Sequence, residues 1–474
     1  MNIIGRKSEI EILNNVMRSK QSEFVVVYGR RRVGKTYLID EYFNKEYSFY
    51  ATGVAETGRT NQLKSFSFSL IQRYGYILSG KITNWFEAFS HLIKFLEQKN
   101  ITRDPITNKR VIFLDELPWF DTPKSDFKAA FDYFWNSYCS KQSDIVLIVC
   151  GSATSWIINN LLSNKGGFYK RVTRKIYIAP FSLKECEMLF NRNSFNCNKE
   201  IIVDSYMIFG GIPYYLNMLN NRLSLAQNIE YLFFKENAPL KNELNDLLAS
   251  LYKNHAKHLK VIKALASNKK IGLSRNDIVM KTKINGETLT NILLELEDCS
   301  FIRKYDNYTT NKTLHLYQLI DPFIYFALDI LEKNNPSSWL SFLNTPKYYS
   351  WKGNSFELVC LNNIESIKVS LGINQIDTNV YSWRSRKSEN GAQIDLLIDR
   401  ADRIINLFEI KYCDSIFEID KQYESQLKNK IACFVGETNT KKSVQLTILT
   451  SNGIKHNSHS EIILRELEIN DLFN

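Results

Sequence analysis

The sequence has no long apolar run. Among its 474 residues, no stretch approaches the roughly 20 consecutive apolar residues that a membrane-spanning helix needs. The longest candidates, such as Ile145 to Cys150, have the length of a buried strand. The opening residues, MNIIGRKSEIEIL, place charges where a secretory signal would be apolar. We therefore expect no membrane partner and a cytoplasmic location.

Patterns typical of disulfide, zinc and serine-hydrolase chemistry are also missing. The eight cysteines include no CxxC pair, and several lie in apolar runs, where a reduced thiol packs as a small hydrophobic group. No GxSxG segment marks a nucleophilic serine. Two histidine pairs, His255 with His258 and His456 with His459, lack Cys or acidic partners at suitable spacing. We expect no metal site at either pair.

The composition is that of a folded, basic protein. Hydrophobic residues make up 44% and charged residues 23%, and at about 150 residues per domain the length allows roughly three domains. The net charge of +11 favours a polyanionic partner such as double-stranded DNA. A merely solvated basic surface is the alternative, and the region after residue 350 is slightly acidic.

A strand, a glycine-rich turn and a helix follow one another near the start. The run FVVVY, 24–28, predicts a strand buried on both faces. It leads into GRRRVGKT and then a helical TYLIDEYF, the GxxxxGK[ST] pattern in its proper context. Backbone amides would cradle phosphates at the helix N-terminus, Lys35 would reach the β- and γ-phosphates, and Thr36 would hold Mg²⁺. The residues expected to bind ATP or ADP are Gly29, Arg30, Arg31, Arg32, Val33, Gly34, Lys35 and Thr36.

Two further strands supply polar residues for the same site. VIFLDE, 111–116, is an apolar strand ending in two acids. Asp115 would complete the magnesium site, and Glu116 would act as general base toward water. DIVLIVC, 144–150, is followed by GSATSW, in which Ser152 or Thr154 could sense the γ-phosphate.

Arg171 follows in the segment FYKRVTRK. It could neutralise charge on the transferred phosphoryl group, from the same subunit or from a neighbour. The second case implies a homo-oligomer. An exposed arginine before the next strand is the alternative interpretation.

These motifs, in this order, carry a family resemblance. GRRRVGKT, VIFLDELPW, the strand ending in CGSA, Arg171 and the later GGIPYYL, 210–216, together resemble the prokaryotic archaeal-type ATPases, a branch near the AAA+ and STAND NTPases. The resemblance implies an ATP-hydrolysing core over 1–180 and a helical lid over 181–250. It also implies that Gly210, Gly211 and Pro213 touch the nucleotide from the lid.

The middle of the chain predicts a small helical module with a strand pair. Helical segments such as HLKVIKALA, 258–266, precede strand-like stretches over 302–319 with a turn at Asn307, which fits a winged helix-turn-helix over 251–330. Lys281 and Lys283 favour contact with DNA phosphates, whereas Glu287 and Glu295 oppose it. DNA reading and protein docking both remain open.

Charged residues recur on neighbouring elements of the last region. After 331–350, a linker or an irregular packing arm, QIDLLIDRADRIINLFEIKY predicts two strands joined by a polar turn over 400–403. Alternation places Glu409 and Lys411 on one face, and Asp395 can lie level with them. Buried charges of this kind must meet a metal or each other. Asp395 and Glu409 could hold Mg²⁺ beside a phosphate, and Gln422 on the next helix could add a polar contact.

The order of these residues resembles the PD-(D/E)xK nuclease fold: Glu357 on a helix, Asp395 on a strand, Glu409-x-Lys411, then Gln422. The resemblance implies a restriction-endonuclease-like α/β domain over 351–474, with these five residues as its catalytic set. The whole chain is then an α/β protein with a P-loop parallel sheet, a helical lid, a winged helix and this last domain. We expect an ATPase whose nucleotide state controls a nuclease-like domain. The alternative is a STAND-like switch with an inactive, partner-binding domain.

Overall fold

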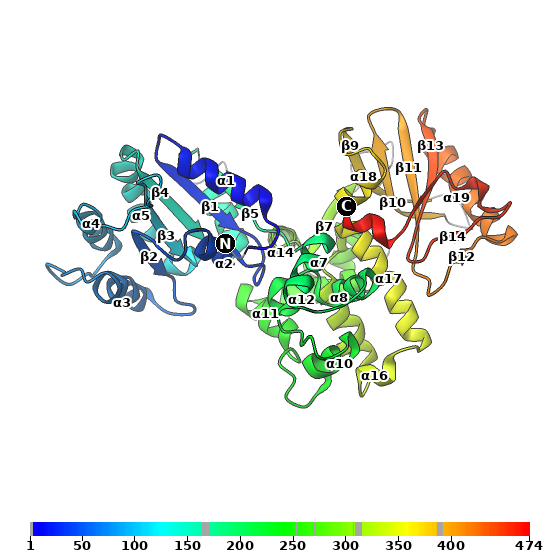
Figure 1. Cartoon of the computed structure of the whole chain (residues 1–474), viewed down its shortest axis with the longest axis horizontal. Helices are drawn as coiled ribbons and strands as arrows, with labels where there is room; N and C mark the ends of the chain where they lie inside the picture. Colours follow the sequence, from blue (N-terminus) through cyan, green and yellow to red (C-terminus); the bar gives the residue numbers. More distant parts are fainter. Residues whose placement is uncertain are drawn as a thin grey trace. The chain divides into compact units, whose positions relative to one another are not determined.

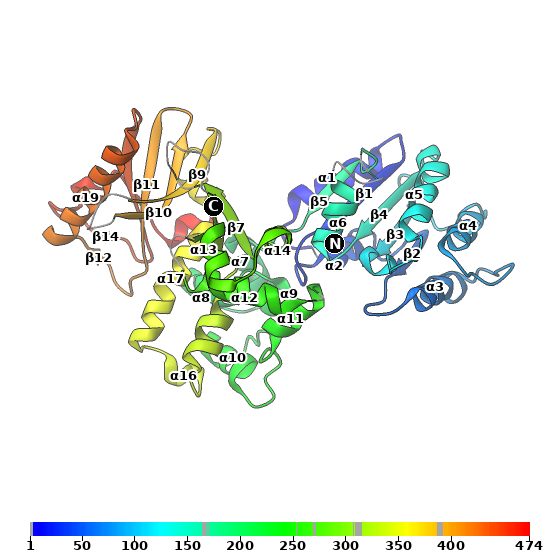
Figure 2. The same cartoon turned by 180° about the vertical axis from the view of Figure 1, so that it is seen from behind.

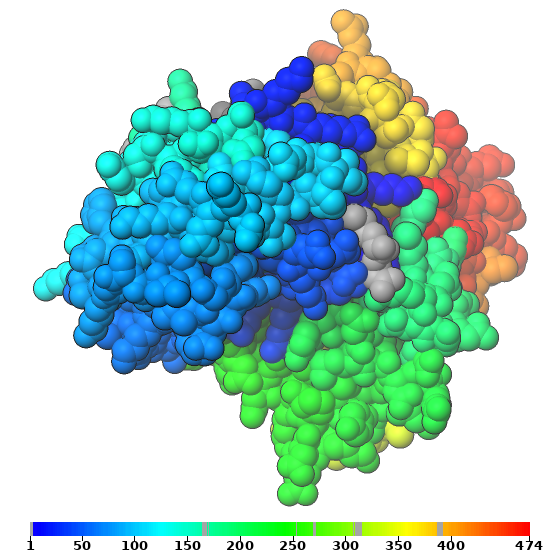
Figure 3. All heavy atoms as spheres, turned by 60° about the vertical axis from the view of Figure 1, so that its left-hand side comes forward, coloured from blue at the N-terminus to red at the C-terminus, as the bar shows by residue number. Residues whose placement is uncertain are grey.

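The computed structural model describes residues 3–163, 168, 170–252, 254–268, 272–306, 308, 315–385 and 392–474. The chain divides into two compact units, Met1–Ala179 and Pro180–Asn474. The spheres of the N-terminal unit, blue to cyan, form one lobe in Figure 3. Within the described ranges, no helix has both the length and the apolar character required to cross a membrane.

A parallel sheet forms the centre of the N-terminal unit (Figure 1). Its strands lie in the order β2-β3-β4-β1-β5, and the pairings are parallel. Strands β3 and β4 are buried at every position, as expected where helices cover both faces of a parallel sheet. The strand bounds are β1 Glu23–Tyr28, β2 Phe49–Thr52, β3 Arg110–Asp115, β4 Ile145–Cys150 and β5 Arg174–Tyr177.

The core on one side of this sheet is rich in aromatic rings. Phe24 on β1 meets Phe131 on α5 edge to face, with ring centroids 5.8 Å apart. Trp85 on α4 meets Phe127 in the same manner at 4.9 Å. These contacts fix the helices against the sheet that carries the site. The helices are α1 Lys7–Arg18, α2 Lys35–Tyr42, α3 Arg59–Phe68, α4 Trp85–Leu96, α5 Phe127–Ser137 and α6 Thr154–Ile157.

The second unit begins with helices, as the sequence predicts. Ser182 caps α7 in a capping box with Glu185. A second group of helices then packs with a small antiparallel sheet of order β6-β8-β7; the predicted turn residue Asn307 lies outside the described residues. The elements are α7 Leu183–Arg192, α8 Lys199–Phe209, α9 Pro213–Leu216, α10 Leu225–Ile229, α11 Glu243–Leu251, α12 His255–Ala266, β6 Leu273–Ser274, α13 Arg275–Thr282, α14 Gly286–Asp298, β7 Ile302–Asp306 and β8 His315–Leu319.

A mixed sheet of order β15-β13-β11-β10-β9 occupies the C-terminal part. Strands β10 and β11 form the predicted antiparallel hairpin. On its other edge, β11 pairs with β13 in parallel. Figure 2 shows α19 beside this sheet. The elements are α15 Pro322–Phe326, α16 Trp339–Phe342, α17 Pro346–Asn362, α18 Ile364–Ser370, β9 Thr378–Arg384, β10 Gln393–Arg400, β11 Ile404–Lys411, β12 Phe417–Glu418, α19 Lys421–Thr438, β13 Ser443–Thr450, β14 Ile454–Lys455 and β15 Arg465–Leu467.

The segment 331–350 is packed against its surroundings. Trp339 is only 2% exposed, and its backbone amide donates to Glu230 Oε2 at 2.7 Å. Its ring lies 5.8 Å from those of Phe326 and Trp351. This segment therefore acts as a packing arm that joins the helices before it to α17.

The packing arm gives a testable pair of substitutions. Trp339→Ala should lower the free energy of unfolding by about 3–5 kcal/mol, because it leaves a cavity among aromatic rings. Leu340→Ala, at the next residue, should change it by less than about 0.5 kcal/mol, because Leu340 is 52% exposed. Urea unfolding followed by circular dichroism measures both. Equal effects would mean that the arm is not packed.

Candidate functional site

The loop after β1 has the geometry of a phosphate cradle. Gly29 adopts a φ of 141°, and a Cβ atom there would lie 2.4 Å from the carbonyl oxygen of Ile178. Only glycine fits this close approach. Gly34, at a φ of 90°, caps α2, which begins at Lys35. The predicted strand, turn and helix are therefore all present.

Lys35 lies inside the loop that it is expected to serve. Its Nζ donates to the carbonyl oxygens of Gly29 at 2.9 Å and Arg30 at 2.8 Å. An ammonium group has three donors, so these two contacts leave one for a phosphate oxygen. Arg6, the residue before α1, supports the same loop, because its Nη2 donates to the Val33 carbonyl at 3.3 Å.

The three loop arginines lie in different environments. Arg30 is buried, Arg32 is partly buried and Arg31 is exposed. Their predicted contact with nucleotide stays a prediction.

The side chains of Thr36 and Asp115 are in contact, as their predicted role of holding one Mg²⁺ ion requires. The Thr36 hydroxyl donates to Asp115 Oδ2 at 3.0 Å, and the backbone amide of Glu116 donates to Oδ1 at 2.9 Å. Burial, and then the neighbouring Glu116 charge, raise the pKa of Asp115 to about 6. A hydroxyl and a buried carboxylate side by side are the hard oxygen donors that Mg²⁺ prefers. The donor set therefore fits a magnesium ion.

Ser152 holds the predicted general base. Its backbone N and its Oγ donate to Glu116 Oε2 at 3.1 and 3.0 Å, and Glu116 itself adopts a left-handed φ of 47°. The Thr154 hydroxyl instead points to the Ser152 carbonyl at 3.4 Å. Of the two candidate sensors, Ser152 is therefore the one that contacts Glu116. Because a hydroxyl has one proton, Ser152 cannot donate to Glu116 and to a phosphate at once.

Arg171 forms an ion pair with Asp132 on α5. The contact of Arg171 with a phosphoryl group stays a prediction. Gly210, Gly211 and Pro213 belong to the second unit. There the Gly211 carbonyl accepts from the Phe181 amide at 2.8 Å, and Pro213 begins α9. The approach of these three residues to nucleotide stays a prediction.

In the C-terminal sheet, Glu409 is surrounded by hydrogen-bond donors. Tyr423 Oη donates to its Oε1 at 2.5 Å and Lys430 Nζ to its Oε2 at 2.6 Å, while Lys411 Nζ lies 3.3 Å from Oε1. Burial alone would raise the pKa of Glu409, but Lys430 and Lys411 outweigh it and the pKa lies below its usual range. The sequence predicted that Glu409 and Lys411 share one face of the strand and missed Lys430 and Tyr423.

The missed residues share one helix face. Tyr423 and Lys430 lie seven positions apart, two helical turns, on α19. The sequence shows that spacing, but it does not show which strand this helix face covers. The predicted Gln422 is exposed.

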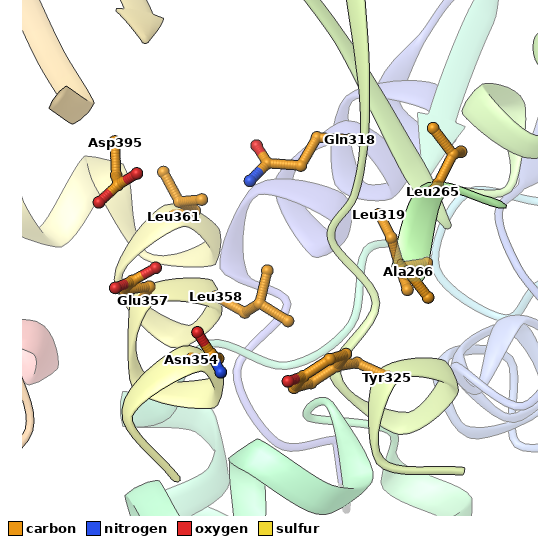
Figure 4. Close-up of a pocket in the computed structure, with 10 residues that line it drawn as sticks. All are labelled: Leu265, Ala266, Gln318, Leu319, Tyr325, Asn354, Glu357, Leu358, Leu361 and Asp395. Atoms are coloured by element: carbon orange, nitrogen blue, oxygen red, sulfur yellow. The ribbon is translucent and has the colours of Figure 1, made fainter. Parts of the chain in front are cut away.

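Glu357 and Asp395 line a separate small cavity of about 10 Å³, room for about one water molecule. Figure 4 shows both carboxylates on the same side of α17, with Leu358 projecting from the other side. A register shift lies between Ile394 and Leu397 in the pairing of β10 with β9, and both of these residues belong to the core that contains Leu427 of α19. The pairing of β10 with β11 runs in register as far as Leu396, opposite Phe408. The alternation expected to place Asp395 on the same face as Glu409 is therefore interrupted.

No group of three or more His, Cys, Asp or Glu side chains in the described ranges is arranged to hold a metal ion. A metal at the C-terminal acids would therefore need ligands of another kind. Phosphate oxygens of a substrate are one such source.

Ser152 can be tested by removing its hydroxyl. Ser152→Ala should lower kcat for nucleotide hydrolysis about ten-fold or more, because a hydrogen bond to a charged group is worth about 1.5–3 kcal/mol. Ser152→Thr should retain activity, and Ser155→Ala, in the same segment, should be neutral. Steady-state kinetics measures all three. An unchanged kcat in Ser152→Ala would show that the hydroxyl has no part in hydrolysis.

The raised pKa of Asp115 predicts a pH dependence. A metal ligand must be deprotonated, so the affinity for Mg²⁺-ATP should fall about ten-fold per pH unit below pH 6 and stay level above about pH 7. Asp115→Asn should bind weakly with no such dependence. Titrations with a fluorescent ATP analogue between pH 5 and 8 check this. Constant wild-type affinity over that range would contradict it.

Comparison with known proteins agrees with the geometry of the N-terminal unit. Residues 3–219 match the family described as an ATPase domain predominantly from Archaea. An uncharacterized protein of Methanocaldococcus jannaschii is 26% identical over 327 residues, 68% of this chain and 67% of that protein. An uncharacterized ATP-binding protein of the same organism is 37% identical over 43 residues, 9% of this chain and 73% of that protein.

Among solved structures, the Walker-type ATPase PABY2304 of Pyrococcus abyssi has a similar fold. The TM-score is 0.50 at 18% sequence identity, and the match covers 69% of this chain and 97% of that one. The likeness shows the fold, and the family match over residues 3–219 identifies that part of the chain as an archaeal-type ATPase domain.

Proposed function

We propose that the chain is an ATP-driven switch in which hydrolysis at the P-loop controls a winged helix and a nuclease-like domain acting on double-stranded DNA. The observation that carries the hydrolytic part is the contact of Thr36 with Asp115 beside a Glu116 held by Ser152. These residues can bind magnesium and ATP, orient an attacking water and take its proton.

Two features of the second unit support the DNA-directed part. Helices α12, α13 and α14 followed by the β7–β8 pair have the order expected of a winged helix. Glu357, Asp395, Glu409 and Lys411 occur on the elements expected of a nuclease-like domain. Arg171 would act on ATP in its own subunit or in a neighbouring one within a homo-oligomer.

A second function is favoured by the surroundings of Glu409. Its two oxygens already accept from Tyr423 and Lys430, so a metal would have to displace a lysine. The C-terminal domain would then bind DNA or another partner without cleaving it, as in a STAND-like switch.

Hydrolysis and cleavage assayed in parallel test the two functions. Lys35→Ala should reduce ATP turnover at least about 100-fold, because it removes a charge from the phosphates. Glu409→Ala and Asp395→Ala should keep ATP turnover within about two-fold. Under the first function they abolish DNA nicking in Mg²⁺ or Mn²⁺, whereas under the second the wild type itself shows no nicking. Glu365→Ala, which removes an acid whose side chain is 83% exposed, is the control.

The outcomes separate the functions. Full ATP turnover in Lys35→Ala would remove the hydrolytic assignment. If the wild type cuts none of a panel of linear, nicked and branched duplexes, the non-cleaving switch is the function that remains.

A further inference from the structure

We propose that Lys411 and Lys430 form a clamp for one phosphodiester group of DNA, positioned by the buried Glu409 and working without a metal ion. The clamp rests on the DNA-directed part of the proposed function and specifies how the C-terminal domain holds the backbone.

The clamp is defined by three side chains from two elements. Glu409 and Lys411 lie two positions apart on β11, and Lys430 comes from α19. The Glu409 side chain is 8% exposed, whereas Lys411 and Lys430 are 37% and 30% exposed. The carboxylate is thus inside and both ammonium groups reach the surface.

The charges in this cluster do not cancel. One carboxylate faces two ammonium groups, so one net positive charge remains. Each ammonium has three donors; Lys430 directs one at Glu409 and Lys411 forms an ion pair with it, which leaves donors on both lysines for a second anion. A phosphodiester has a single negative charge and two free oxygens, one for each lysine.

Neighbouring residues hold the cluster in place. Tyr423 donates to Glu409, and its ring centroid lies 5.5 Å from Lys411 Nζ. Asp420 fixes the start of α19 by accepting from the Tyr423 amide at 2.7 Å. Ordering the lysines before binding reduces the entropy lost when a ligand arrives.

A phosphodiester fits this arrangement better than a metal ion does. Both oxygens of Glu409 are engaged, and a cation approaching them would meet two positive charges at short range. DNA is the ligand of this proposal because the clamp specifies the DNA-directed part of the proposed function; the region after residue 350 is itself slightly acidic, so the attraction is local to the two lysines. An acidic peptide is the other ligand to test.

Binding of a fluorescent 20-base-pair duplex, measured by anisotropy in EDTA over a range of salt, tests the clamp. Lys430→Ala should weaken binding roughly ten-fold, because it removes one charge-assisted hydrogen bond to the phosphate. It should also reduce the slope of log K against log salt concentration by about 0.9, the value expected when one phosphate contact is lost. Lys428→Ala is the matched control: it removes the same charge two positions away on α19, from a side chain that is 63% exposed and paired with Glu424. It should weaken binding less than about two-fold.

Tyr423→Phe gives a second measurement that keeps every charge. It removes the hydrogen bond that positions Glu409, so it should weaken DNA binding several-fold with an unchanged salt slope. It also tests the clamp if Lys430→Ala does not fold, which circular dichroism will show.

Four results would overturn the clamp. Equal losses in Lys428→Ala and Lys430→Ala would mean a diffuse charge effect. Binding by the wild type only with Mg²⁺ would mean a metal site. Polyglutamate displacing DNA at equal charge concentration would mean a protein ligand. Finally, if the wild type binds no DNA even at low salt, the DNA-directed part of the proposed function fails and the clamp fails with it, whereas the first three results leave that function standing.

Discussion

The chemistry of the N-terminal unit depends on the parallel order of β3, β4 and β1. Parallel strands end at one edge of a sheet, so the P-loop after β1, Asp115 at the end of β3 and Ser152 after β4 meet there. The hydrogen bond between Thr36 and Asp115 is the direct result. Because β4 lies between the other two strands, Ser152 is placed to reach Glu116. The strand order thus brings together the P-loop, the predicted metal ligands and the predicted base.

The sequence predicted this edge because each of its parts has a strong local signal. Apolar runs of strand length end in glycine or in acids, and a P-loop requires a strand before it and a helix after it. The β10–β11 hairpin and the helices of the second unit have equally regular patterns. What the sequence did not reveal depends on contacts between elements. Arg171 pairs with Asp132, and Trp339 packs against Trp351. In each case the two residues lie on different elements of the chain.

The acidic residues of the C-terminal sheet show the same limit of prediction from sequence. Perfect strand alternation predicts that Asp395 and Glu409 share a face, but a register shift against β9 between Ile394 and Leu397 interrupts the alternation, and Asp395 lines a cavity with Glu357. One extra residue in a strand changes the face to which a side chain points, and no residue type in QIDLLIDR marks that extra residue. Likewise, Lys430 reaches Glu409 only because α19 packs over β11, a contact with no local sequence signal.

The two buried carboxylates that the sequence assigned to metals differ in their partners. Asp115 accepts from a hydroxyl and a backbone amide, both neutral, and burial raises its pKa to about 6. A cation placed beside it would supply the charge compensation that these donors lack. Glu409 has two lysines, and its pKa lies below the usual range. A second cation there would gain little attraction and would have to displace an existing one. Compensation of the carboxylate charge therefore favours a metal ion at the P-loop and a lysine-bound anion at the C-terminal site.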